Sequence, residues 1–113
     1  MFVMKLKAEP FEKIKSKEKI WEIRLNDEKR RNVHVGDVIL FKKMPDILEG
    51  IVTRVVDKKF FKSFREMAQV LSLKELGFDD NANADIVDEF YHTIYSVDKE
   101  KEYGIVALKL ELV

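Results

Sequence analysis

The segment KSKEKIWEIRLNDEKRR, residues 15–31, decides both the expected fold and the expected site. It opens with lysines at every second position, continues as a mixture of apolar and charged residues, and closes on a basic run at 29–31. Successive side chains of a strand point to opposite faces, so Glu22 and Arg24 share one face of a strand over 20–27. The other face carries the apolar residues Trp21, Ile23 and Leu25.

Three charged groups therefore come together around this strand. Lys19 lies where the expected preceding helix ends and the strand begins, and its side chain can reach the face of Glu22 and Arg24. Arginine offers a rigid fork of donors, glutamate accepts from amino groups on a base edge, and lysine meets a phosphate or, once buried, acts as a base. Such a set can bind a planar polar ligand. The alternative is a solvent-exposed Glu–Arg pair worth about 1 kcal/mol or less.

Length and composition predict a single domain, 1–113, with a packed core, because the chain has 113 residues of which 46% are apolar. There is no cysteine, and His34 and His92 lie too far apart in sequence to suggest metal-ligand spacing. We therefore expect no metal and no cofactor. No apolar run approaches the length of a membrane helix, so we expect a soluble, cytoplasmic protein without a membrane partner.

The charge is unevenly distributed along the chain although it sums to zero. Residues 1–66 hold 17 Lys and Arg against 11 Asp and Glu, a net charge of +6, whereas residues 67–113 hold 4 against 10, a net charge of −6. The first part can present a positive face to a polyanion. Alternatively, the two parts interleave in space and their charges neutralise each other.

Hydrophobic periodicity predicts a β-α-β-β-β-α-α-β order. The expected strands lie at 2–8, 20–27, 38–43, 51–61 and the end of 97–113, and the expected helices lie at 9–19, 63–73 and 79–96. Most strand connections are too short for parallel crossovers. The fold class is therefore α+β: a small, mostly antiparallel β-barrel with two to three peripheral helices.

Finer signals concern the helices. Ser63 followed by Glu66 forms a capping box, Gly77 ends a short turn at 74–78, and the start of 97–113 is a polar turn. Aromatic residues at helical or strand spacing are usually core, although they can also stack on bases. Tyr91 and Tyr95 are the pair we expect to be exposed. The full aromatic set is Phe60, Phe61, Phe64, Phe90, Tyr91 and Tyr95.

The stretch KIKSKEKIWEIRLND resembles the signature of the ASCH domain family, which belongs to the PUA-like superfamily of small β-barrels. That signature usually reads Gly-x-Lys-x-x-Glu-x-Arg, and here Lys19, Glu22 and Arg24 occupy its charged positions. VGDVILF (35–41) and EYGIVALKLEL (102–112) are also similar, so the resemblance spans nearly the whole chain. Lys17 replaces the usual glycine, which would permit a left-handed helix end, so the replacement bears on where Lys19 points.

The resemblance implies binding of RNA or a nucleotide in a cleft beside the signature strand. We expect Glu22 and Arg24 to contact the base or its sugar, and Lys19 and the basic run to contact phosphates. The predicted ligand-binding residues are Lys17, Lys19, Glu22, Arg24, Lys29, Arg30 and Arg31. The basic run can also be a solvated turn.

The alternative function is an amidohydrolase. A bacterial branch of the family hydrolyses N4-acetylcytidine with a lysine, a threonine and a glutamate; the lysine falls on Lys19, but the threonine falls on Glu22. Thr53 and Thr93 are the threonines of this chain, and Glu66, Asp85 and Glu89 are acids that could complete a site. A third hypothesis is an interaction protein in which the Glu22–Arg24 pair has no functional role.

Overall fold

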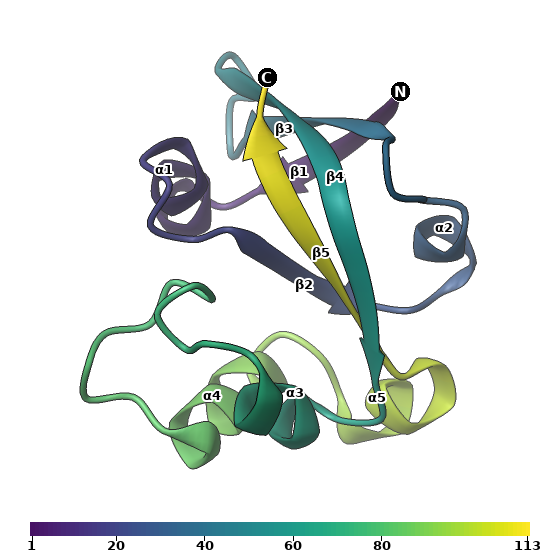
Figure 1. The fold of residues 1–113 in the computed structure, drawn as a ribbon, viewed down its shortest axis with the longest axis vertical. Helices are drawn as coiled ribbons and strands as arrows, with labels where there is room; N and C mark the ends of the chain where they lie inside the picture. The colour runs from purple at the N-terminus through teal and green to yellow at the C-terminus, as the bar shows by residue number, and fades with distance from the viewer.

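The computed structural model describes residues 1–113 and contains one five-stranded sheet in the order β1-β3-β4-β5-β2 (Figure 1). The strands are β1 (Phe2–Leu6), β2 (Trp21–Leu25), β3 (Val38–Lys43), β4 (Gly50–Phe61) and β5 (Ile105–Leu112). β1 pairs with β3 in parallel, and every other pairing is antiparallel. The sheet curls into a half-barrel whose edges are β1 and β2. The predicted α+β, mostly antiparallel fold is confirmed.

Five helices accompany the sheet: α1 (Ala8–Lys15), α2 (Glu28–Arg31), α3 (Phe64–Val70), α4 (Ala84–His92) and α5 (Val97–Tyr103). α3 and α4 lie within the predicted helical regions 63–73 and 79–96, and α1 begins one residue before the predicted region 9–19. Ser63 caps α3 by accepting from the backbone N–H of Glu66 at 3.0 Å. The side chain of Glu66 accepts from the N–H of Lys62 at 3.3 Å, so the reciprocal bond is made one residue before the cap.

The prediction of a polar turn after residue 96 was wrong, because α5 occupies that position. Ser96 caps this helix by accepting from the N–H of Lys99 at 3.1 Å, and Gly104 ends it at a φ of +70°. A second unpredicted helix, α2, begins after Asp27, whose side chain accepts from the N–H of Arg30 at 3.1 Å. Both helices are short and polar, so caps rather than apolar periodicity mark them.

Two apolar clusters form the core, one on each face of the sheet. The first contains Phe11 and Ile14 of α1 together with Val106 and Leu108 of β5. The second lies between the other face of β2 and β5 and the helices α3 and α4, and it contains Trp21, Ile23, Phe64, Met67, Val87 and Ile105. Figure 1 shows α3, α4 and α5 gathered where β4 ends.

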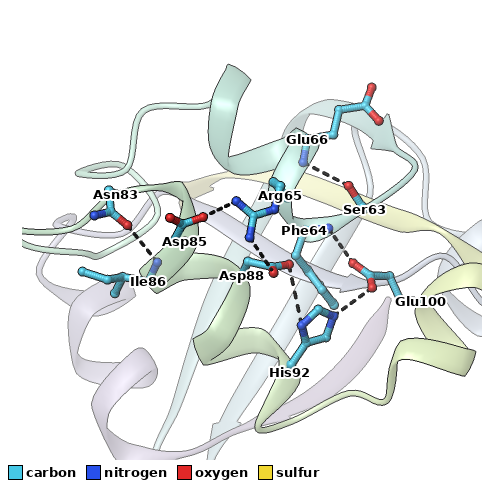
Figure 2. Close-up of polar contacts among 10 residues, drawn as sticks. All are labelled: Ser63, Phe64, Arg65, Glu66, Asn83, Asp85, Ile86, Asp88, His92 and Glu100. Carbon is cyan, nitrogen blue, oxygen red and sulfur yellow. Dashed lines mark hydrogen bonds and ion pairs between the residues drawn. The ribbon is translucent and has the colours of Figure 1, made fainter.

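These three helices are joined by a polar network that Figure 2 shows, here called the helix junction: Arg65, Asp88, His92 and Glu100. Glu100 is 6% exposed and accepts from the backbone N–H of Phe64 and from Nε2 of His92, both at 2.8 Å. Nδ1 of His92 lies 3.6 Å from Asp88, which also pairs with Arg65 at 3.3 Å. Each charged side chain of the junction therefore has a partner on another helix or one turn away.

Candidate functional site: a cleft above a buried Lys–Glu–Arg cluster

The connection from α1 to β2 fixes the position of Lys19. Ser16 ends the helix, and Lys17 then adopts a φ of +69°, in the left-handed region that usually selects glycine. The backbone N–H of Lys19 donates back to the carbonyl of Lys13 at 3.0 Å. Lys17 thus makes the left-handed turn that a glycine would make, and this turn places Lys19 directly before the strand.

Lys19, Glu22 and Arg24 form one cluster, here called the cleft floor, in which Lys19 and Glu22 are buried and Arg24 is partly exposed. Lys19 is 6% exposed and Glu22 is 4% exposed. Oε2 of Glu22 lies 2.7 Å from Nε of Arg24, and Oε1 lies 3.7 Å from Nζ of Lys19. Glu22 and Arg24 are paired with Leu108 and Val106 of β5, so they share the sheet face that packs against α1. The alternative of a solvent-exposed pair does not fit this burial.

Backbone carbonyls from distant segments complete the cluster. Nζ of Lys19 donates to the carbonyl of Leu76 at 3.2 Å. Nη2 of Arg24 donates to the carbonyl of Lys5 at 2.9 Å, which links the two edge strands β2 and β1. The cluster therefore depends on parts of the chain 19 and 57 residues away from it.

The segment 74–78 forms a wall beside Lys19. The carbonyl of Glu75 accepts from the N–H groups of Ile20 and Trp21, at 2.8 and 3.2 Å. Gly77 has a φ of +94°, and a Cβ there would lie 3.3 Å from Cβ of Lys19. Glycine is required at this position both for its backbone conformation and for the close packing of the lysine stem.

A cleft of about 1150 Å³ opens above the cluster. One side is lined by residues from β1, α1 and the connection after it, where the acids Glu9 and Glu18 are outnumbered by four lysines, Lys5, Lys7, Lys13 and Lys17. The other side is lined by residues 74–82 and by one face of α4. On that face Ile86 and Phe90 are 45 and 46% exposed, and Ile94, just beyond the end of α4, is 51% exposed. The cleft thus combines a charged floor, a basic side and an apolar side.

Two tyrosines of the α4 region reach the cleft beside the floor. The rings of Tyr91 and Tyr95 stack on Phe64 with centroids 5.0 and 5.7 Å away, and both residues line the cleft. Neither hydroxyl makes a hydrogen bond within the protein, and both hydroxyl oxygens are accessible, although Tyr91 as a whole is only 5% exposed. The prediction that this is an exposed pair was wrong, because stacking on Phe64 buries Tyr91 and half-buries Tyr95.

Burial shifts the ionisation of the floor. Desolvation lowers the pKa of Lys19 below its ordinary value, although the charge of Glu22 partly opposes that shift. Burial also lowers the pKa of Arg24, but Glu22 and neighbouring groups outweigh it, so that pKa is raised. Burial followed by the charge of Glu22 raises the pKa of Tyr91, so its hydroxyl stays neutral.

Comparison with known proteins identifies the fold. The model of the ASCH domain matches residues 4–113. The chain belongs to the ASCH domain family. Two solved structures are similar to it. The crystal structure of hypothetical protein PH0355 has 29% sequence identity and a TM-score of 0.87, and the match covers 99% of this chain and 98% of that chain. The solution NMR structure of protein PF0455 from Pyrococcus furiosus has 30% identity and a TM-score of 0.75, and the match covers 99% of this chain and 96% of that chain. A comparison with curated proteins finds no match.

The predicted ligand-binding residues of this ASCH domain fall into two groups. Lys17, Lys19, Glu22 and Arg24 all line the cleft. The basic run, Lys29, Arg30 and Arg31, forms α2 and does not line it. Arg30 pairs with Asp27 at 3.1 Å, and Arg31 donates to the carbonyl of Asn26 at 3.0 Å. A role for the run on phosphates stays a prediction that applies outside the cleft.

The acids and threonines considered for a hydrolase lie away from the cleft of the ASCH fold. The side chain of Glu66 accepts from the backbone N–H of Lys62, and Asp85 forms an ion pair with Arg65 of α3. Thr53 donates its hydroxyl to the carbonyl of Ile39, and Thr93 donates to the carbonyl of Phe90. The carboxylate nearest to Lys19 is Glu22 itself. Sequence reasoning missed Leu76 and considered the two tyrosines only as an exposed stacking pair, because these residues reach the floor only through the tertiary fold.

No helix of the structure has the length and apolar character that crossing a membrane requires. Asp88, His92 and Glu100 present possible metal-ligating atoms within 4.8 Å of one another. Arg65 and the backbone N–H of Phe64 already engage the two carboxylates, so we interpret this group as structural.

Proposed function

We propose that this protein binds RNA or a nucleotide in the cleft, with Lys19, Glu22 and Arg24 at the floor. The observation that carries the proposal is the buried Lys–Glu–Arg cluster beneath a cleft of about 1150 Å³. Burying charges costs several kcal/mol per ion, and a purely structural site would do as well with apolar residues. Perturbed, buried charges that line a cleft are typical of functional sites.

The sides of the cleft suit a nucleic acid. Lys5, Lys7 and Lys17 line the basic side and form no ion pair within the protein. Free lysines of this kind contact phosphates and position the ligand. On the opposite side, Phe90 is 46% exposed and packs edge-on against Phe78 with centroids 5.4 Å apart. Exposed aromatic rings beside cations are the usual means of holding unpaired bases.

The test is fluorescence anisotropy of a labelled structured RNA with wild-type protein and Arg24→Ala at two salt concentrations. We expect salt-sensitive binding that weakens at least about tenfold in Arg24→Ala, because a hydrogen bond to a charged group contributes about 1.5–3 kcal/mol. Arg54→Ala is the matched control, since Arg54 is exposed on β4 and does not line the cleft. Circular dichroism verifies that each variant is folded.

Two results would count against the proposal. If neither RNA nor mononucleotides bind at either salt concentration, the proposed function is wrong. If Arg24→Ala and Arg54→Ala weaken binding equally, RNA binds to a general basic surface and not in the cleft.

A second candidate function is hydrolysis of an acylated nucleoside such as N4-acetylcytidine, with water as co-reactant and cytidine and acetate as products. The observation that favours it is the burial of Lys19, which lowers its pKa and so raises the share of neutral amine that can act as a base or nucleophile. We expect turnover to vanish in Lys19→Ala. Turnover should persist in Lys13→Ala, because Lys13 lies on the side of the cleft and not at its floor. Acetylated cytidine that stays intact through a long incubation with wild-type protein would exclude this substrate.

A further inference from the structure

The two oxygens of Glu22 are already engaged by the protein. Oε2 accepts from Nε of Arg24 at 2.7 Å, and Oε1 faces the ammonium of Lys19 at 3.7 Å. The carboxylate is also 4% exposed. It therefore orients the two cations and has little capacity left to accept from the amino group of a base, which is the role that the sequence pattern suggested for it.

Donors, by contrast, remain unused at the floor. An arginine has five N–H donors. Arg24 uses one on Glu22 and one on the carbonyl of Lys5, and the rest have no partner in the protein. The hydroxyls of Tyr91 and Tyr95 make no hydrogen bond either, and both residues line the cleft. When Lys19 is protonated, it and Arg24 lie opposite a single carboxylate, and the floor then carries one surplus positive charge.

We propose that the cleft floor is an oxyanion site that holds the terminal phosphate of a nucleotide or of an RNA strand, while the base lies against the apolar side of the cleft. This inference rests on the proposed function, and it moves Arg24 from the base, where the sequence analysis placed it, to the phosphate that Lys19 also contacts. Unused N–H and O–H donors beside a surplus positive charge recognise an acceptor-rich anion. Arginine recognises phosphate with two parallel hydrogen bonds in the same way.

The remainder of the cleft fits this orientation. Ile86, Phe90 and Ile94 follow one another at a spacing of four residues along the α4 region and expose about half of their surface. They form an apolar surface beside the floor on which a base can stack. The adjoining segment contributes Asp79 and Asp80, which repel further phosphates on that side. A single phosphate at the end of a chain avoids that repulsion.

The experiment compares labelled six-nucleotide RNAs of one sequence that carry a 5′-hydroxyl, a 5′-phosphate or a 3′-phosphate. We expect one terminal phosphate to tighten binding to wild-type protein by about tenfold or more, because several charge-assisted hydrogen bonds form at the floor. Arg24→Gln removes the advantage of the phosphate. Tyr95→Phe, which deletes only the hydroxyl, reduces it, whereas the control Tyr103→Phe on α5 leaves it unchanged.

Competition with the four 5′-mononucleotides and the matching nucleosides separates the two sources of phosphate. Mononucleotides that compete as well as the phosphorylated strand identify a free nucleotide as the ligand, and weaker competition identifies an RNA end. Equal binding of phosphorylated and unphosphorylated strands overturns the oxyanion site but leaves the proposed function standing. A phosphate advantage that survives in Arg24→Gln overturns it too. Failure of every strand and nucleotide to bind overturns both.

The position of the base has its own test. Phe90→Ala should weaken all the strands about tenfold, with or without a terminal phosphate, because stacking on an aromatic ring contributes about 1–3 kcal/mol per base. Val70→Ala is the control, since Val70 is an exposed apolar residue of α3 outside the cleft. Loss of the phosphate advantage alone in Phe90→Ala would place the phosphate, not the base, at this side and overturn the orientation.

Discussion

The cleft floor and the helix junction are two buried polar clusters that lie on different sides of α4, and they differ in how completely their groups are paired. At the junction, Glu100 receives two donors and His92 lies between two carboxylates. At the floor, Arg24 and two tyrosine hydroxyls keep donors without protein partners. The side-chain polar atoms that are fully buried without a partner are Asn26 Oδ1 and Arg30 Nε, so the free donors at the floor are accessible from the open cleft. The satisfied cluster joins helices, whereas the unsatisfied cluster faces a cleft and fits a ligand.

The largest expected effect is that of Glu22→Ala. Removal of the carboxylate leaves Lys19 and Arg24 as buried like charges without their counter-ion, so we expect the free energy of unfolding to fall by about 3 kcal/mol. Urea denaturation measures it. Glu22→Gln keeps an acceptor for Arg24 and should lose less. A loss below about 1 kcal/mol in Glu22→Ala would mean that the floor is more hydrated than its exposure indicates.

Glu100→Ala tests the other cluster. It removes the acceptor for the N–H of Phe64 and for His92, so we expect a loss of about 2 kcal/mol in urea denaturation. RNA affinity should remain unchanged under conditions where the variant is folded. Glu102→Ala is the control, because Glu102 is an exposed acid on the same helix. Weakened RNA binding in the folded Glu100→Ala protein would show that the two clusters are coupled through α4.

Lys19→Met separates function from stability at the floor. Burial lowers the pKa of Lys19, so between that lowered pKa and the ordinary value of about 10.4 the unfolded chain binds more protons than the folded one. The free energy of unfolding therefore rises with pH across this window. In Lys19→Met the free energy of unfolding should not rise with pH in this way, while the methionine still packs an apolar stem against Gly77.

We expect Lys19→Met to lie within about 1 kcal/mol of wild type at pH 7, because a neutral Glu22–Arg24 pair remains. From pH 7 to pH 9.5 the stability difference should move in favour of the wild type, as urea denaturation at both pH values would reveal. An unchanged difference would assign Lys19 an ordinary pKa. Loss of RNA binding in this stable variant would mark Lys19 as a functional residue.

Sequence reasoning located part of the floor and missed the rest for identifiable physical reasons. The period of two along β2 correctly placed Glu22 and Arg24 on one face, since it depends only on local backbone geometry. It could not give their burial, because the covering groups Leu76 and Tyr91 come from distant parts of the chain. α5 was missed because a polar helix has no apolar stripe.

The smallest effect is expected at Lys17, the one place where this chain departs from the glycine of the family signature. A residue with a side chain at a φ of +69° costs about 1 kcal/mol, and a glycine relieves that cost but gives the unfolded chain more freedom. We expect Lys17→Gly to raise the free energy of unfolding by about 0.5 kcal/mol. Lys17→Ala keeps the strain and should not stabilise. Because Lys17 also lines the cleft, both variants should lose the same small part of RNA affinity. If only the alanine variant loses affinity, the turn rather than the charge of Lys17 aims Lys19 at the ligand.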